Sequence, residues 1–366
     1  MRRMNLENEY NNRQRVPHHG EIMGRWKAAS ETFCESLGDR AELGISYGEG
    51  ERQAYDVFWP ESDRDAAPLV VYIHGGYWQR GDRSDYSIVA EGFVAAGCVV
   101  AVPSYSLCPD AKVMDIIGEL TAFITELYKK MKRRPVVVGH SAGGHLASAL
   151  LATDWSGHGD VPADVVRQAY AISGVFNLRP LIRTSINDAL GLERDAADDA
   201  SPALWSVPAG RRLVAAVGAL ESREFIRQSI EIAARWGEVG VRTDCVIVPD
   251  TNHFTVIHQL REPGSGMFER ILEMARLSDA DFEKRFAELP EKKPVEPATA
   301  EAAPEDVAEE AADSPETSET SETSETSDGA ASAIADAAVD DPQAAEETTE
   351  SVNASETETA PETTEG

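Results

Sequence analysis

The stretch VVVGHSAGGHLA, residues 136–147, decides the fold. It begins as a short β-branched apolar run, which is typical of a buried strand, and continues into a helix expected over Ala142–Ala152. Ser141 stands at the junction in the pattern G-x-S-x-G, where the small residues Gly139 and Gly143 permit a sharp turn. Such a turn projects the serine hydroxyl beside the free amides of the helix start. We therefore predict that Ser141 is a nucleophile rather than part of an ordinary glycine-rich loop.

A second glycine-rich turn, HGGYW at residues 74–78, follows an apolar strand upstream of the serine. Gly75 and Gly76 let the backbone approach a substrate carbonyl closely enough to donate an N–H group. We predict that this turn and the serine turn together bind the oxyanion. One amide would come from Gly76 or Tyr77 and the other from Ala142.

The remaining residues of the HGGYW turn have more than one interpretation. His74 is expected to hydrogen-bond within the turn rather than to act as the base, because the base should come late in the chain. Tyr77 and Trp78 either line a pocket that accepts an aromatic group or pack against the fold. We include both aromatic residues in the predicted substrate-binding set.

The predicted base is His253, in the sequence VPDTNHF at residues 248–254. In chains with this serine turn, the acid and then the histidine follow the nucleophile. His253 lies just past an expected strand, at the sheet edge where Ser141 is also expected. The other histidines are weaker candidates. His18 and His19 lie in the N-terminal segment, His158 lies in a polar loop, and His258 lies on an expected helix. His140 and His145 lie too close to the serine to face it.

The acid is predicted to be Glu221, which follows the strand expected before the one that leads to His253. Its carboxylate would hold the imidazole in the right tautomer and stabilise the imidazolium. Asp250 is the rival, although a carboxylate so close to the histidine on one loop more often caps a turn. Glu224 is expected in the first turn of a helix, where it complements the helix dipole.

Around these motifs, apolar runs alternate with segments of helical period, which predicts an α/β fold with a mostly parallel sheet covered by helices on both faces. Two early runs suit an antiparallel hairpin at one edge, and the later runs resemble buried central strands. The hairpin runs are 44–47 and 53–60, and the later strands are 69–73, 98–102, 135–138, 169–172, 213–217 and 245–248. Helices are expected over 116–131, 142–152, 225–236 with Gly237 as its C-cap, and 268–277.

Composition divides the 366 residues into three parts: an N-terminal arm over 1–40, one domain over 41–285, and a tail over 286–366. Residues 301–366 contain 21 Asp or Glu and no Lys or Arg, so they carry −21 of the net charge of −30. They are rich in Ala, Glu, Thr, Ser and Pro and poor in residues that form a core, so we predict a disordered, solvated spacer rather than an interaction segment.

The rest of the composition excludes several classes of function. The acidic balance argues against nucleic acid or an anionic membrane as a partner. No signal peptide or membrane span is apparent, so a cytoplasmic protein is expected. The cysteines, at positions 34, 98, 108 and 245, are too scattered for a disulfide framework or a zinc site, and we expect no cofactor and no metal. The oligomeric state stays open, with a homodimer as one option.

Together, HGGYW, GHSAGGHLA, GALESREFIRQS and DTNHF resemble the arylformamidase (kynurenine formamidase) branch of the α/β-hydrolases, over about residues 8–280. The resemblance implies an α/β-hydrolase fold, with Ser141 as nucleophile, Glu221 as acid, His253 as base and Gly75–Gly76 as the oxyanion loop. Family members often have Asp in place of Glu221. The implied reaction is hydrolysis of N-formyl-kynurenine to kynurenine and formate in tryptophan breakdown. The alternatives are a carboxylesterase with another small acyl ester as substrate, or a non-catalytic binding protein of the same fold.

Overall fold

The structure of the chain, a computed structural model, describes residues 4–61 and 63–287. Its centre is an eight-stranded sheet with the strand order β1-β2-β4-β3-β5-β6-β7-β8. β1 and β2 form an antiparallel hairpin and β2 is antiparallel to β4, whereas all later pairs are parallel. The strands are β1 (Ala41–Ser46), β2 (Ala54–Phe58), β3 (Leu69–Ile73), β4 (Val99–Pro103), β5 (Val136–His140), β6 (Gln168–Ile172), β7 (Arg212–Gly218) and β8 (Arg242–Val248).

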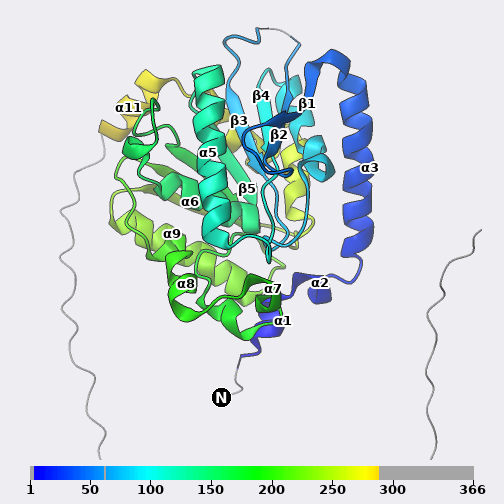
Figure 1. Cartoon of the computed structure of the whole chain (residues 1–366), viewed down its shortest axis with the longest axis vertical. Helices are drawn as coiled ribbons and strands as arrows, with labels where there is room; N and C mark the ends of the chain where they lie inside the picture. Colours follow the sequence, from blue (N-terminus) through cyan, green and yellow to red (C-terminus); the bar gives the residue numbers. More distant parts are fainter. Residues whose placement is uncertain (1–3, 62, 288–366) are drawn as a thin grey trace, which may run out of the picture. The chain divides into compact units, whose positions relative to one another are not determined.

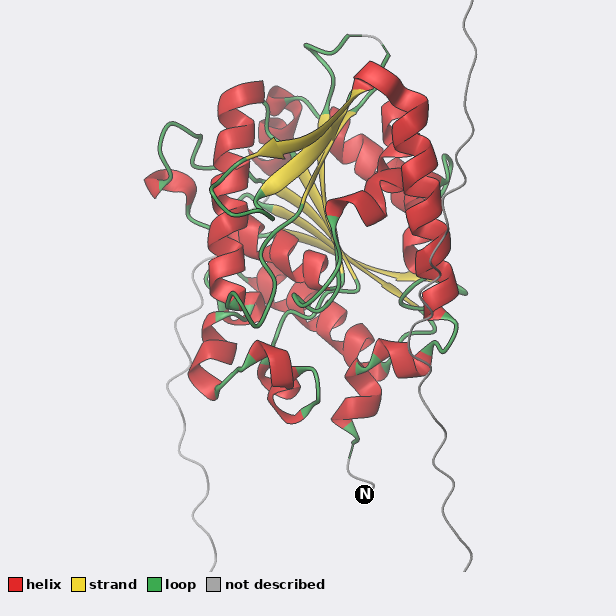
Figure 2. Ribbon diagram, turned by 45° about the vertical axis from the view of Figure 1, so that its right-hand side comes forward, coloured by secondary structure: helices red, strands yellow, loops and turns green. Residues whose placement is uncertain are grey.

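Helices cover both faces of the twisted sheet (Figures 1 and 2). The α-helices are α1 (Leu6–Tyr10), α2 (Asn12–Arg15), α3 (His19–Leu37), α4 (Glu91–Ala95), α5 (Val113–Met131), α6 (Ala142–Ala152), α7 (Asn187–Leu190), α8 (Arg194–Asp199), α9 (Arg223–Glu238), α10 (Gly266–Arg276) and α11 (Asp279–Ala287). Three short 3₁₀ segments also matter for the packing: η2 (Arg83–Ala90), η4 (Arg179–Arg183) and η6 (Val256–Arg261).

Two apolar clusters, one on each face of the sheet, form the core. The first contains side chains of α5, α6 and α9, and the second contains side chains of α3, η2, α4, η6 and α10. Alternate residues of one strand point to opposite faces, so Val71 of β3 belongs to the first cluster and Val70 to the second. Strands β2 to β7 are buried along their whole length. The sheet is therefore shielded on both faces, as parallel strands require.

The α/β class, the mostly parallel sheet and the antiparallel edge hairpin are confirmed. Observed strand boundaries lie within about three residues of the predicted ones, and β3 and α6 match at both ends. One prediction about burial was wrong: β8 is an edge strand with much of its surface exposed. The apolar residues of β8 resemble those of a central strand, so the sequence did not indicate that β8 lies at the edge of the sheet.

Two helix predictions also need correction. Gly237 is not a C-cap, because α9 continues through it to Glu238. The N-terminal segment, in which no element was predicted, contains the 19-residue helix α3, which packs along one side of the sheet (Figure 1). The predicted tail, 286–366, lies outside the described residues apart from its first two. The four cysteines are free, and no helix in the described ranges is long and apolar enough to cross a membrane.

The parallel strands bring three loops to one edge of the sheet. Ser141 follows β5, Glu221 comes three residues after β7, and His253 comes five residues after β8. Strands β5, β6, β7 and β8 are consecutive neighbours. The carboxyl ends of parallel strands meet at one edge, so residues 80 and 112 positions from Ser141 in the sequence can reach it.

Candidate active site

Ser141 occupies a strained turn between β5 and α6. Its backbone has φ 56° and ψ −119°, a conformation that few residues other than glycine adopt. The turn is tight enough that a Cβ on Gly139 would lie 2.0 Å from the carbonyl oxygen of Gly143, so position 139 requires glycine. The predicted G-x-S-x-G geometry is thus present in the backbone, with the serine side chain at the tip.

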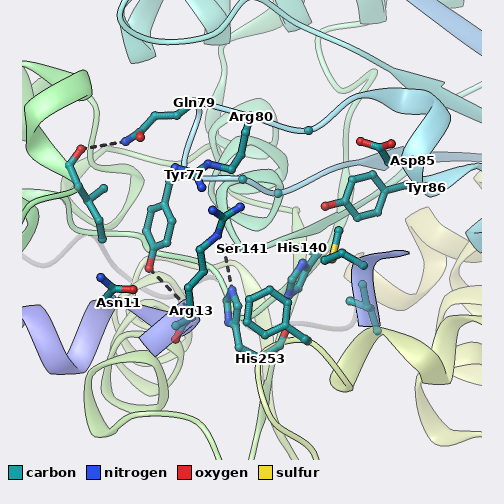
Figure 3. Close-up of a pocket in the computed structure, with 18 of the residues that line it drawn as sticks. Asn11, Arg13, Tyr77, Gln79, Arg80, Asp85, Tyr86, His140, Ser141 and His253 are labelled. Carbon is teal, nitrogen blue, oxygen red and sulfur yellow. Dashed lines mark hydrogen bonds between the residues drawn. The ribbon is translucent and has the colours of Figure 1, made fainter. Parts of the chain in front are cut away.

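The three residues proposed from the sequence as nucleophile, base and acid form one hydrogen-bonded chain. His253 Nε2 lies 3.0 Å from Ser141 Oγ, and His253 Nδ1 lies 2.7 Å from Glu221 Oε2. Figure 3 shows the contact between serine and histidine. All three residues are buried. With the Nδ1 proton directed at the carboxylate, Nε2 is free to accept the proton of the serine hydroxyl.

The other oxygen of Glu221 has two donors of its own. Ser173 Oγ donates to Oε1 at 2.5 Å, and the backbone N–H of Gly218 donates to the same oxygen at 2.8 Å. Ser173 immediately follows β6, the strand between those that lead to Ser141 and Glu221. Sequence reasoning missed Ser173. Its place at the end of a central strand was the one signal that could have indicated it.

The rival carboxylates lie elsewhere. Asp250 is exposed in the turn after β8, with a φ of 57°. Glu224 starts α9, as predicted, and accepts hydrogen bonds from Arg227 and from the Tyr10 hydroxyl. The hydrogen bonds from Arg227 lower the pKa of Glu224 despite its partial burial. Neither residue contacts the His253 ring, so Glu221 is the carboxylate that the fold brings to this imidazole.

The HGGYW turn lies directly against the serine turn. A Cβ on Gly75 would be 2.8 Å from the carbonyl oxygen of His140 and 3.0 Å from Ser141 Cβ, so only glycine fits there without a shift. Within residues 4–61 and 63–287, the amides of Gly76, Tyr77 and Ala142 have no hydrogen-bond acceptor. These are the amides that were predicted from the sequence to donate hydrogen bonds to the oxyanion.

His74 and Trp78 serve the structure around this turn. His74 is stacked between Tyr86 and Tyr105, and its Nδ1 lies 2.8 Å from the carbonyl oxygen of Gly75. Burial lowers the pKa of His74 to about 4, so the ring is neutral near pH 7. Trp78 is fully buried in the core and packs edge-on against His145 at 4.9 Å. Trp78 therefore does not line the pocket, which corrects its inclusion in the predicted substrate-binding set.

His140, set aside because it adjoins the nucleophile, has a contact that sequence reasoning did not find. Its Nε2 lies 2.8 Å from the carbonyl oxygen of His253, and its ring lies beside the His253 ring with centroids 4.7 Å apart. Burial lowers the pKa of His140 well below its usual value. A neutral His140 that donates to this carbonyl oxygen fixes the loop on which His253 stands.

A cavity of about 410 Å³ opens onto Ser141 and His253. This volume lies in the range of small-molecule sites. Tyr77, Tyr86 and Phe254 give the wall an aromatic character, and the polar part comes from two arginines, an aspartate and several amides. The residues that line the cavity are Asn11, Asn12, Arg13, Met23, Gly75, Gly76, Tyr77, Gln79, Arg80, Gly81, Asp85, Tyr86, His140, Ser141, Ser185, Ile186, His253, Phe254 and Ile257.

One wall of this cavity comes from the N-terminal segment, α1 and α2 with their junction at Asn11. Tyr77 donates its hydroxyl proton to the carbonyl oxygen of Tyr10, which binds the segment to the HGGYW turn. The Tyr10 hydroxyl in turn donates to Glu224 at 2.7 Å and accepts from Gln228 at 2.7 Å, which binds the segment to α9. The sequence predicted an N-terminal arm without assigning it a role, and the structure makes this segment part of the pocket.

Comparison with known proteins gives consistent matches. The family model described as BD-FAE matches residues 55–163. The kynurenine formamidase of Salmo salar is 30% identical over 240 residues, which are 63% of this chain and 81% of that protein. A carboxylesterase of Mycobacterium tuberculosis is 30% identical over 161 residues, 42% of this chain and 49% of that protein. A solved structure from Silicibacter sp. TM1040, given a provisional thioesterase assignment, is 35% identical with a TM-score of 0.66 and covers 74% of this chain and 100% of its own.

The fold and these relatives define a hydrolase of the esterase or formamidase type. The chain belongs to the α/β-hydrolase esterase family, on the branch that it shares with the kynurenine formamidases.

Proposed function

We propose that the chain is a serine hydrolase that acts through Ser141, His253 and Glu221 on a small aryl formamide of the N-formyl-kynurenine type. The observation that carries the proposal is the unbroken hydrogen-bonded chain, 3.0 Å from serine to histidine and 2.7 Å from histidine to glutamate. The serine end of this chain faces a cavity of small-molecule size.

The reaction has two acyl-transfer steps. Ser141 Oγ attacks the formyl carbon while its proton moves to His253 Nε2, and Glu221 stabilises the imidazolium that forms. The amides of the HGGYW turn and of Ala142 hold the oxyanion. The C–N bond then breaks, and the arylamine leaves with the proton from His253. Water, deprotonated by the same histidine, attacks the formyl-enzyme and releases formate.

Two features support an aryl formamide as substrate. The aromatic side chains that line the cavity suit a flat aromatic group beside the reacting carbonyl. The relatives named kynurenine formamidase, 29–30% identical over 230–240 residues, act by their name on a formamide of kynurenine. The second candidate is a carboxylesterase with a small acyl ester as substrate, which the Mycobacterium tuberculosis relative favours. A non-catalytic binding protein is the least supported, because the chain supplies the whole hydrogen-bonded triad.

Replacing Ser141 with alanine tests the nucleophile. We expect a folded protein with turnover near background and no labelling by a fluorophosphonate probe. Ser148→Ala is the matched control, since Ser148 is a buried serine of α6 that donates only to the carbonyl oxygen of Gly144. Full turnover in the Ser141 variant would contradict the mechanism.

The substrate is tested by a panel measured under identical conditions. N-formyl-kynurenine is compared with short and long p-nitrophenyl esters, and kcat/KM is determined for each. We expect the formamide to have the highest value. A strong preference for an ester would replace the formamidase assignment with the carboxylesterase one.

A further inference from the structure

The cavity contains positive charge that the protein itself does not neutralise. Arg13 and Arg80 both line it, together with one carboxylate, Asp85. Within the described ranges, neither arginine side chain has an ion pair or a hydrogen-bond acceptor. The charges that act most on Asp85 come from Lys27, Asp82 and Arg52 rather than from this pair. The two arginines are therefore free to bind a ligand.

The positive charges of the two arginines act on one another across the cavity that both residues line. Partial burial and the positive charge of Arg80 lower the pKa of Arg13. In Figure 3, Arg13 extends from α2 toward the region above Ser141 and His253, and Arg80 lies on the same side of the cavity. Two like charges that face a common space repel each other, and an anion between them removes this repulsion.

The backbone around each arginine is held by its neighbours. Arg13 belongs to the segment held by the hydrogen bonds of Tyr10 to Tyr77 and to α9. Arg80 follows a turn in which the amide of Gln79 donates to the carbonyl oxygen of Gly76 at 3.1 Å, and the Gln79 side chain donates to Ile186 at 2.8 Å. The two side chains thus reach the cavity from two separate backbone segments, each of which is held in place, and this lowers the cost of bringing both to one anion.

We propose that Arg13 and Arg80 form a carboxylate subsite beside Ser141, and that the substrate bears a carboxylate on the part that leaves. This inference rests on the proposed function and narrows its substrate class. Guanidinium groups bind carboxylates through paired N–H donors, and the subsite would hold the substrate with its formyl carbon at the serine. N-formyl-kynurenine satisfies the requirement through its amino-acid carboxylate. A local positive pair also counters the net charge of −30, which repels anions from the chain as a whole.

The test uses two matched substrate pairs. In each pair, the carboxylate is replaced by an uncharged carboxamide: N-formyl-kynurenine with its carboxamide, and 4-acetoxybenzoate with 4-acetoxybenzamide. The quantity measured is the ratio of kcat/KM between the member with the carboxylate and the member with the carboxamide. The full-length wild-type chain should prefer the carboxylate member of a pair, and added salt should reduce this preference because it screens the charges.

Arg13→Gln and Arg80→Gln should each lower the ratio several-fold, by at most about tenfold, because both residues are exposed to solvent, which weakens a charged hydrogen bond. Arg13→Lys should retain part of the preference. Arg15→Gln is the matched control: Arg15 lies on the same helix but does not line the cavity, so the ratio should not change. An equal loss of kcat/KM for both members of a pair would mean that the arginines only support the fold, and would overturn the subsite.

The two pairs separate this proposal from the proposed function. Hydrolysis of 4-acetoxybenzoate in preference to its amide, without hydrolysis of either formamide, would retain the carboxylate subsite and reject the formamidase. Rapid hydrolysis of N-formyl-kynurenine with a ratio near one would retain the formamidase and reject the subsite.

Discussion

Replacing Ser173 with alanine removes a hydrogen bond from the proposed triad while leaving its three members intact. Ser173 Oγ donates at 2.5 Å to Glu221 Oε1, and the amide of Gly218 donates to the same oxygen at 2.8 Å. The Glu221 side chain has no exposed surface, so water does not replace the lost donor unless the cavity left by the hydroxyl admits it. The variant therefore tests how much the buried carboxylate depends on its second partner.

The magnitude follows from these contacts. A hydrogen bond to a charged group contributes about 1.5–3 kcal/mol, and the lower end applies here because the Gly218 amide remains. A loss of about 1.4 kcal/mol corresponds to a factor of ten. A Glu221 carboxylate that loses one donor is held less firmly against His253 Nδ1. We therefore expect kcat to fall by up to about tenfold, with a smaller change in KM.

The assay measures kcat and KM separately for whichever substrate the panel identifies, with unfolding followed by urea titration in parallel. Ser148→Ala is the control, because it removes a similarly buried hydroxyl that does not contact the triad. Its kcat and KM should match those of the wild type. If Ser173→Ala lowers activity only in proportion to the folded fraction, Ser173 supports the fold and does not position Glu221.

Three further variants test other parts of the site. Gly75→Ala should lower kcat more than tenfold with a smaller effect on stability, because its Cβ would lie 2.8 Å from the His140 carbonyl oxygen; unchanged kcat would show that the turn adapts. Tyr10→Phe removes two hydrogen bonds that hold the N-terminal segment, so urea titration should show a loss of about 1–2 kcal/mol and KM should rise. Burial lowers the pKa of His145 to about 4, so its neutral form contributes stability that is complete above pH 6.5 and is lost as the pH falls toward 4. The contribution is at most about 3 kcal/mol, and His145→Gln should flatten the fall in unfolding free energy over that range; an equally steep fall in the variant would assign it to other groups.

The sequence could predict the parts of the site that depend on chain order. A serine turn after a β-branched strand, a glycine pair after another strand, and a histidine after the last strand each have a local signature. Parallel pairing brings strand ends together, so these signatures also indicate proximity in space. Glu221 could be preferred over Asp250 on the same basis, and the structure places Glu221 at the imidazole while Asp250 remains in an exposed turn.

The remaining parts depend on tertiary contacts that leave little trace in the sequence. Ser173 resembles any small polar residue after a strand until the Glu221 carboxylate is seen beside it. Arg13 is one basic residue in a polar stretch, and only the fold of the N-terminal segment carries it to the cavity. Helix α3 could have been found, since its buried residues Ile22, Trp26, Phe33 and Leu37 follow a helical period with Ser30 between them.

In this protein, the residues proposed for catalysis and part of the pocket wall come from separate segments of the chain. The proposed triad lies in turns that follow β5, β7 and β8, whereas a wall of the pocket belongs to α1 and α2, which are joined to the domain by a few side-chain hydrogen bonds. Substitutions in that short stretch can therefore alter which molecules are accepted without disturbing the strained serine turn. For protein engineering, residues 5–15 are a compact library target.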